Sequence, residues 1–286
     1  MKSSPNKRVS VIVPNYNYGK YLRGRIWSIL RQTYPIYELI VLDDASTDGS
    51  KELAKELVLD LQLKKPEMRV KFLGNDQNSG KAMRQWEKGV KEATGDYIWI
   101  AEADDRSSPK FLEEVMKGFD DPEVVLAYAE SAIINGAGLV IAPNFRWSRD
   151  REKTGHFAQS YTKNGEDEIR EIMAIRCTIP NVSGVVFKNT AEFRRTLAEA
   201  AEKYEQVGDW HLYLKLLAGG KIAYNKKALN KFRVHKGSAT KRGAEHLKEV
   251  VGVHKAVREK YELDARVLEA IEAEEMRIRE KYGIME

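Results

Sequence analysis

Cysteine and long apolar runs are nearly absent from this chain of 286 residues. The single cysteine, Cys177, has no partner for an intramolecular disulfide and no spacing that suits zinc, which indicates a reducing compartment. The longest apolar runs, such as residues 9–13 and 39–42, are far shorter than the roughly 20 residues of a membrane helix, and residues 1–5 begin no secretory signal. We therefore expect a cytoplasmic protein.

Blocks of one charge sign are also missing. The net charge is +5, yet the lysines and arginines are interleaved with 43 acidic residues and form no basic stretch with aromatic spacing. This pattern argues against nucleic acid as a partner. The positive excess suits a nucleoside diphosphate or an anionic membrane surface equally well. Peripheral association with the inner face of a membrane is therefore a further expectation.

Strand-like and helical patterns alternate through the first hundred residues. This alternation predicts an α/β protein with a largely parallel mixed sheet flanked by helices. The strand-like segments are 9–13, 38–42, 69–73 and 97–101, and apolar residues recur at helical spacing in 21–31 and 50–61. Farther along, 109–119 and 209–217 resemble helices, whereas 124–134, 184–187 and 221–234 resemble strands.

Two later regions have a different character. Residues 142–164 are polar and aromatic without periodicity, which is typical of a substrate loop. Residues 244–282 form charged amphipathic helices, so we divide the chain into an α/β domain, 1–242, and a helical extension, 243–286. We expect the apolar stripe of the extension to dock a partner or form a homodimer. The stripe consists of Leu247, Val250, Val251, Val257, Leu263, Val267 and Ile271.

A cluster of carboxylates follows the apolar strand at 96–101. Its sequence is Glu102-Ala103-Asp104-Asp105, and open α/β sheets bind ligands at the carboxyl ends of their strands. Hard oxygen ligands with few protein contacts suit Mg²⁺ or Mn²⁺ shared with a diphosphate. Taken alone, the cluster is equally typical of a solvated turn before a helix.

Loops after the first two strands should open at the same edge of the sheet. The first begins at Pro14-Asn15-Tyr16, and the second begins at Asp43-Asp44. The Tyr16 ring suits stacking on a base, and a carboxylate suits a base N–H. Turn chemistry is the alternative for Tyr16 and Asn17.

Two further loop segments give weaker evidence for function. Ser46 or Asp48 also suits the N-cap of the next helix. The loop after the third strand, 75–81, supplies amides, a glycine and a cation for phosphate or base contacts. It lacks the spacing of a Walker loop, so an ATPase has little support.

Together these segments resemble the family 2 glycosyltransferases, which have the GT-A fold. The resemblance runs from Val9 to about Thr240 and is most specific in VSVIVPNYNYGKYLRGRIWSILRQTYPIYELIVLDDASTDGS. It also includes NSGKA and the Asp-x-Asp position of Glu102-Ala103-Asp104. It implies nucleotide-sugar contacts at Pro14, Tyr16, Asn17, Asp43, Asp44, Asn78, Lys81, Glu102, Ala103 and Asp105, and metal or diphosphate contacts at Asp104 and His235.

The resemblance also implies a general base. QVGDWHLYLKLLAGG is similar to the helix start that bears the base of the family, which is Asp209 here, and KFRVHKGSAT is similar to the closing strand and loop. Departures from the family pattern are Glu102 for Asp, Gly208 for an acidic residue, Lys215 for Arg and Phe232 for Tyr.

The implied activity is a metal-dependent, inverting transfer of a sugar, with Mg²⁺ or Mn²⁺ as cofactor. The donor would be a nucleoside-diphosphate sugar, most readily UDP or dTDP, and the acceptor a glycan or a lipid-linked hydroxyl in polysaccharide synthesis. An inactive sugar-nucleotide-binding partner remains an alternative, because of Gly208 and Glu102. A receiver-type signalling module is a second alternative on the strength of Asp43-Asp44, although it leaves the chain beyond about residue 130 unexplained.

Overall fold

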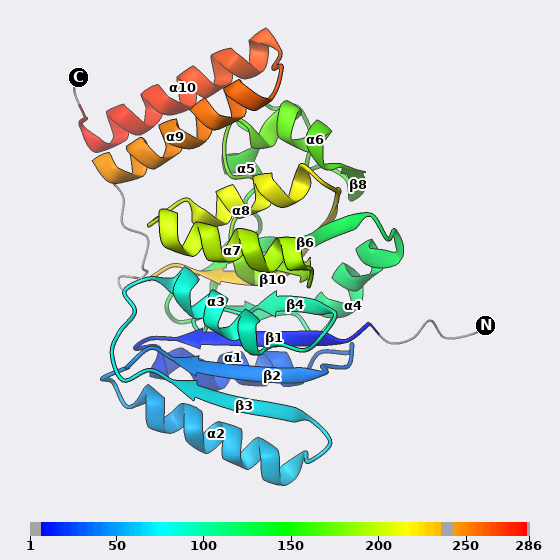
Figure 1. Cartoon of the computed structure of the whole chain (residues 1–286), viewed down its shortest axis with the longest axis vertical. Coiled ribbons are helices and arrows are strands. Elements are labelled where there is room, and N and C mark those ends of the chain that lie inside the picture. The colour runs from blue at the N-terminus through cyan, green and yellow to red at the C-terminus, as the bar shows by residue number, and fades with distance from the viewer. Residues whose placement is uncertain (1–6, 236–242, 285–286) are drawn as a thin grey trace.

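The computed structural model describes residues 7–235 and 243–284, and within them ten strands join in one sheet (Figure 1). The strands are β1 Val9–Asn15, β2 Glu38–Asp43, β3 Arg69–Gly74, β4 Tyr97–Ile100, β5 Arg106–Ser107, β6 Val124–Ile134, β7 Val140–Ala142, β8 Tyr161–Asn164, β9 Val185–Lys188 and β10 Lys221–Arg233. The helices are α1 Gly19–Leu30, α2 Ser50–Lys64, α3 Ala82–Glu92, α4 Phe111–Met116, α5 Arg146–Arg149, α6 Gly165–Glu168, α7 Ala191–Lys203, α8 Gly208–Leu217, α9 Ala244–Lys260 and α10 Ala265–Tyr282. Short 3₁₀ helices are η1 Lys117–Asp120 and η3 Val182–Gly184, and η2 Ile169–Met173 is a short π-helix.

The order of the sheet is β3-β2-β1-β4-β9-β6-β10-β5, with β7 on β6 and β8 on β10. Strands β3, β2, β1 and β4 are mutually parallel, as the alternating pattern predicts. Strand β9 lies antiparallel between β4 and β6, and the long β6 and β10 strands are parallel to each other. The predicted α/β class is confirmed, with its antiparallel pairs in the second half of the chain.

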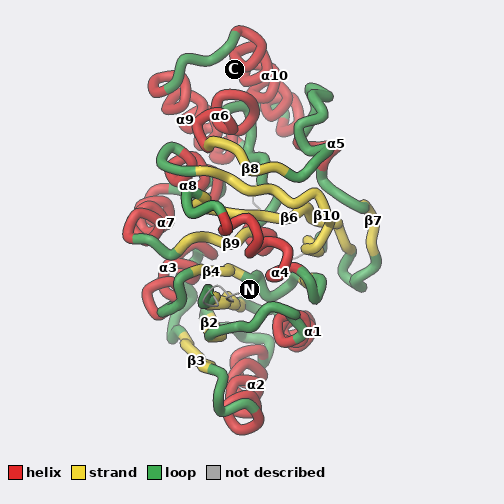
Figure 2. Tube along the Cα trace, turned by 90° about the vertical axis from the view of Figure 1, so that its right-hand side faces the viewer, coloured by secondary structure: helices red, strands yellow, loops and turns green. Residues whose placement is uncertain are grey.

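Strand residues alternate between two apolar layers, one on each face of the sheet. Ile12 and Ile40 face a cluster that includes α3, α7 and α8, whereas Val11 and Val41 face a cluster that includes α1, α2 and α4. Figure 2 shows α3, α7 and α8 on one side of the strands and α1 and α4 on the other. Burial on both faces explains why β1, β2 and β4 carry mostly apolar runs, whereas the edge strand β3 is partly exposed and alternates.

The apolar stripe of the extension is buried against the chain's own core, which corrects the expected docking face. Helices α9 and α10 lie side by side beyond α8 (Figure 1), and α10 also contacts η2. Leu247, Val250, Val257, Val267 and Ile271 are at most 6% exposed and belong to the same core cluster as α8. A dimer through the outer surface of these helices stays a prediction. The expected boundary at residue 242 lies outside the described residues.

The expected substrate loop, 142–164, is partly built into the core. It contains α5 and β8, and its Arg149 forms a buried ion pair with Glu130 of β6. Phe157 from the same loop is 1% exposed and lies 4.0 Å beneath the Arg149 guanidinium. These contacts anchor the segment, so a substrate role for its exposed parts stays a prediction.

Candidate active site

A buried asparagine joins the loop after β1 to the loop after β2. Asn15 is 2% exposed and donates from Nδ2 to the Asp43 carboxylate and to Ser50 Oγ, both at 2.8 Å. Asp43 also accepts the backbone N–H of Ser46 at 3.0 Å. The Asp43 carboxylate therefore holds the two loops together, and its contact with a base stays a prediction.

Asn17 fixes the same pair of loops from the outside. Its backbone is left-handed, with φ 57°, and its N–H donates to Ser46 Oγ at 2.9 Å. Its Oδ1 accepts the Thr47 N–H at 2.7 Å. The neighbouring Tyr16 side chain is 45% exposed, so its ring is available for the predicted stacking on a base. Pro14 is buried within β1 and offers only its backbone.

The N-cap residue of α2 is Gly49, so neither Ser46 nor Asp48 is the expected N-cap, although Asp48 bonds to the starts of two helices. Its carboxylate accepts the backbone N–H of Ser50, the first residue of α2, and that of Gly19, the first residue of α1, each at 2.9 Å. One side chain thus satisfies a donor at both helix starts, where such groups lack intrahelical partners.

The second carboxylate of the pair organises the loop after β3. Asp44 is 4% exposed and accepts bonds from the Asn75 amide at 2.6 Å, the Ser79 N–H at 2.9 Å and the Gln85 amide at 2.9 Å. Its carbonyl oxygen accepts from the Asn78 side chain at 3.1 Å. Asp44 and Asn78 therefore shape the loop, and their predicted contacts with a nucleotide stay predictions.

The acidic cluster after β4 combines carboxylates that repel one another. Glu102 accepts the Trp86 indole N–H at 2.6 Å, and burial together with the charge of Asp104 raises the pKa of Glu102 to about 8. Asp105 is 2% exposed and accepts the Arg233 N–H at 2.8 Å. Burial and the same neighbour raise the pKa of Asp105 to about 7. Raised pKa values mean that these two carboxyl groups retain protons up to near-neutral pH, and a bound cation would favour their ionised forms.

Asp104 and His235 meet although 131 residues separate them. His235 Nε2 lies 3.0 Å from the Asp104 carboxylate, and its ring meets the edge of Tyr18 with centroids 5.5 Å apart. The Arg233 guanidinium donates to the Asp104 carbonyl at 2.6 Å. The structure thus pairs the two residues expected to contact a metal, one from the end of β4 and one from the end of β10. Ala103 between the acids is fully buried, so only its backbone is available to a ligand.

A second buried arginine, besides Arg233, acts on the acidic cluster. Arg25 of α1 is fully buried, stacks on Trp99 at 5.0 Å and donates to Ser107 Oγ at 2.8 Å. Burial lowers the pKa of Arg25 to about 10, while the charges of Asp105 and Asp104 oppose that shift. Arg25 therefore partly offsets the charge of the acidic cluster from beneath.

The donor set fits a divalent cation that shares its ligands with a substrate. Among residues 7–235 and 243–284, no group of three or more His, Cys, Asp or Glu is close enough to form a complete protein cage. The Asp104–His235 pair with Glu102 and Asp105 nearby instead offers a few ligands and further carboxyl groups that a bound cation would ionise, which suits a cation completed by phosphate oxygens.

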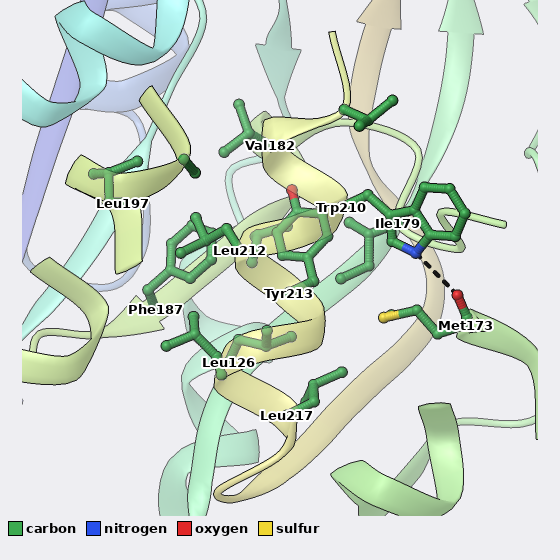
Figure 3. Packing of buried hydrophobic residues seen from close by; sticks show 14 of the residues in the cluster. Leu126, Met173, Ile179, Val182, Phe187, Leu197, Trp210, Leu212, Tyr213 and Leu217 are labelled. Carbon is green, nitrogen blue, oxygen red and sulfur yellow. Dashed lines mark hydrogen bonds between the residues drawn. The ribbon is translucent and has the colours of Figure 1, made fainter. Parts of the chain in front are cut away.

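Helix α8 carries Asp209 in its first turn. Asp209 accepts the Trp210 N–H at 2.8 Å, and burial raises its pKa from 3.8 to about 6. Figure 3 shows Trp210 and Tyr213 packed among the core residues around this helix, with the Trp210 indole bonded to the Met173 carbonyl at 2.9 Å. The helix is therefore rigid, and Asp209 is a carboxylate with raised basicity.

Contacts through α3 connect Asp209 with the acidic cluster. Trp86 of α3 binds Glu102, and Met83, one turn earlier, packs on Gly208. A Cβ at residue 208 would lie 2.2 Å from Met83 Sδ, so the methionine fills the space of a side chain there. This explains structurally how the chain accommodates glycine where the family pattern has an acid.

Lys81, expected to contact the donor, points toward the start of α8. Its Nζ lies 2.5 Å from the Glu205 carboxylate and 3.4 Å from the Glu202 carbonyl. The predicted phosphate contact therefore requires the Glu205 pair to open, and it stays a prediction.

Sequence reasoning missed residues that support the site from other elements, namely Arg25, Trp86, Ser183, Arg233 and Glu249. Ser183 accepts the Glu102 N–H at 3.1 Å. A signal existed only for Trp86, because 82–92 carries apolar residues at helical spacing. The others act through contacts between residues that lie 42 to 128 positions apart in the sequence.

A cavity of about 330 Å³ lies elsewhere on the molecule. Tyr128, Tyr161 and Tyr224 line it, at the first halves of β6 and β10 rather than at their carboxyl ends. It is lined by none of the candidate active-site residues described in this section. The site is therefore identified by the chemistry of its side chains and not by the presence of a cavity.

A family comparison decides which of the expectations apply. The model of "Glycosyl transferase family 2" matches residues 10–178, more than half of the chain. The chain belongs to glycosyltransferase family 2. This membership replaces the receiver-module alternative. The matched residues include the loops after β1, β2 and β4, whereas Asp209 and His235 lie beyond them.

Relatives and solved structures agree with the family. The chain is 32% identical over 109 residues to the putative teichuronic acid biosynthesis glycosyltransferase TuaG of Bacillus subtilis, covering 38% of this chain and 40% of TuaG. It is similar to S. aureus TarS 1-349 in complex with UDP-GlcNAc, with a TM-score of 0.66, 18% identity, and coverage of 96% of this chain and 73% of that one. The mannosyltransferase PcManGT from Pyrobaculum calidifontis, in complex with GDP-Man and Mn²⁺, gives a TM-score of 0.58 at 20% identity, with coverage of 95% and 70%.

The structural likeness confirms the GT-A fold. At this sequence identity the likeness shows the fold alone. The chain spans about 40% of the length of the first curated relatives it matches. Within the part of the chain that the structure describes, no helix has the length and apolar character to cross a membrane.

Proposed function

We propose that the chain is a metal-dependent, inverting glycosyltransferase that uses a nucleoside-diphosphate sugar. The observation that carries the proposal is the meeting of Asp104 and His235 beside Glu102 and Asp105, at the edge where the loops of β1 and β2 also open. When bound, Mg²⁺ or Mn²⁺ supplies positive charge to the departing diphosphate, and Asp104 and His235 are the residues that would hold it.

Asp209 is the general base of this proposal. The acceptor oxygen forms a bond to the anomeric carbon while the bond from that carbon to the diphosphate breaks, and the electron pair leaves with the nucleotide. The acceptor proton passes to the Asp209 carboxylate. A pKa of about 6 leaves this carboxylate ionised at neutral pH yet more basic than an ordinary aspartate, which favours proton transfer.

Uridine or thymidine diphosphate remains the proposed donor nucleotide. Thermal unfolding with UDP, dTDP, GDP and CMP, each with Mn²⁺ or with chelator, tests it, because a ligand that binds only the folded state raises the melting temperature. We expect one diphosphate to stabilise the chain with Mn²⁺ and the Asp104→Ala variant to lose that metal dependence. A wild-type chain that responds to no nucleotide would favour the inactive-partner alternative.

The acceptor is proposed to be a glycan or lipid-linked hydroxyl in polysaccharide synthesis, consistent with the similarity to TuaG, a putative teichuronic acid biosynthesis glycosyltransferase. The β6–β7 hairpin supports an association with the inner face of a membrane, because Leu139 of its turn and Ile141 of β7 are 66% and 60% exposed. A Cβ at Gly138 would lie 3.6 Å from the Arg106 guanidinium, so positive charge adjoins this apolar turn. Sedimentation with anionic vesicles should weaken in Leu139→Ser/Ile141→Ser and persist in the control Leu63→Ser; equal binding by all three chains rejects this surface.

A further inference from the structure

A carboxylate of the extension lies at the segment that leads into α8. Glu249 of α9 accepts three consecutive backbone N–H groups, from Glu205 at 2.8 Å, Gln206 at 2.9 Å and Val207 at 3.1 Å. Val207 immediately precedes α8 and contributes no side-chain cap. A carboxylate at a helix start satisfies unpaired donors and interacts favourably with the helix dipole. Glu249 thus binds the N–H of Val207, the N-cap residue of α8, and the N–H groups of the two residues before it.

The same segment is held from the other side by Lys81. The ammonium group pairs with Glu205 at 2.5 Å and also lies within 3.5 Å of the Tyr204 carbonyl. Residues 204–207, which precede Asp209 in the chain, are therefore held between the loop after β3 and the first helix of the extension. The interactions from both sides are charge-assisted, which makes them stronger than neutral ones.

The position of Glu249 is itself fixed by its helix. Val250, next to it, is 3% exposed in the core. His254, one turn farther along, lies with Nε2 3.0 Å from the Ile175 carbonyl and with its ring edge on Trp210 at 5.4 Å. Helix α9 therefore contacts the start of α8 twice: Glu249 binds Val207 before Asp209, and His254 contacts Trp210 directly after it.

We propose that Glu249 is a positioning residue for Asp209, and that the C-terminal helices therefore form part of the active site. The inference rests on the proposed base role of Asp209. Asp209 lies two residues after the last N–H that Glu249 binds, so release of that N–H lets the first turn of α8 tilt. Displacement of a reacting group by about 1 Å costs about 100-fold in rate.

Full-length Glu249→Ala and Glu249→Gln test the proposal, with Glu245→Gln, an exposed position on the same helix, as the matched control. Nucleotide release is measured from a panel of UDP-, dTDP- and GDP-sugars. We expect kcat to fall about 10- to 100-fold in both Glu249 variants, with the KM for the donor within about twofold of wild type, because the substituted residue lies outside the donor loops. Glu249→Gln keeps the side-chain size, so its loss of kcat excludes a packing defect.

Amide hydrogen exchange gives a readout that does not depend on activity. The amides of 205–207 should exchange faster in both Glu249 variants and at the wild-type rate in Glu245→Gln. Unchanged kcat in the Glu249 variants overturns the inference, whatever the exchange rates. Full turnover by Asp209→Asn would instead refute the base, so the two failures are distinguishable.

Discussion

The two halves of the site are held together in different ways. The donor half, after β1, β2 and β3, is held by side chains from those same loops, as in the bonds of Asn15 to Asp43 and of Asn75 to Asp44. The base half, at the start of α8, is held by residues from remote segments, chiefly Lys81, Met83 and Glu249. The donor half is therefore self-contained, whereas the base half depends on how the whole chain folds.

The largest expected effect separates the halves by function. Asp209→Asn should lower kcat about 1,000-fold or more, because the amide accepts no proton, while metal-dependent nucleotide stabilisation remains. Nucleotide release and thermal shift, measured on one preparation, check both parts. Unchanged turnover would remove Asp209 from the mechanism and favour another base.

The same variant has an expected effect on stability. The pKa of Asp209 is raised in the folded state, so ionisation costs stability as the pH rises from about 4 to 6. The shift of about two units corresponds to roughly 3 kcal/mol; partial exposure lowers this, and we expect Asp209→Asn to gain about 1–2 kcal/mol at pH 7. Denaturant unfolding should show the gain at pH 7 and its disappearance at pH 3.5.

The contrast also explains what the sequence could predict. The strand ends and their polar loops are local patterns, so 9–13, 38–42, 69–73 and 97–101 matched strands β1 to β4 closely. Glu249 and Arg25 carry no local signal, because each acts on residues more than 40 positions away. The apolar stripe of the extension was visible, yet its partner was not, since periodicity shows that a face is buried and not what buries it.

A smaller effect is expected from loosening the extension alone. Glu274 of α10 is 7% exposed and pairs with Arg176, Arg151 and Arg277. Despite an opposing effect of burial, these arginines lower the pKa of Glu274 to about 2, so its contribution is present above about pH 4.5 and is lost as the pH falls toward 2. Glu274→Gln should lower the free energy of unfolding by about 2 kcal/mol at pH 7, because Arg176 stays buried without its full complement of charge.

Denaturant unfolding at pH 7 and pH 3 checks this, with Glu272→Gln, an exposed neighbour on α10, as control. The difference between Glu274→Gln and wild type should shrink at the lower pH, and the control should match wild type at both. The donor half should keep its nucleotide response in both Glu274→Gln and Glu272→Gln, because neither change touches its loops. Loss of that response in Glu274→Gln would show that the donor half also depends on the extension.

The smallest effect concerns the contact at which the halves meet. A Cβ in Gly208→Ala would press on Met83 Sδ, the flexible end of a long side chain, so we expect a loss of about 1 kcal/mol by overpacking. Met83→Ala alone removes apolar contact, whereas the double variant gives the new methyl group room. The double variant should therefore be less destabilised than the sum of the single changes, which denaturant unfolding of all four chains measures. Additive losses would mean that Met83 does not occupy the space beside Gly208. Another contact at the start of α8 would then explain why position 208 is a glycine.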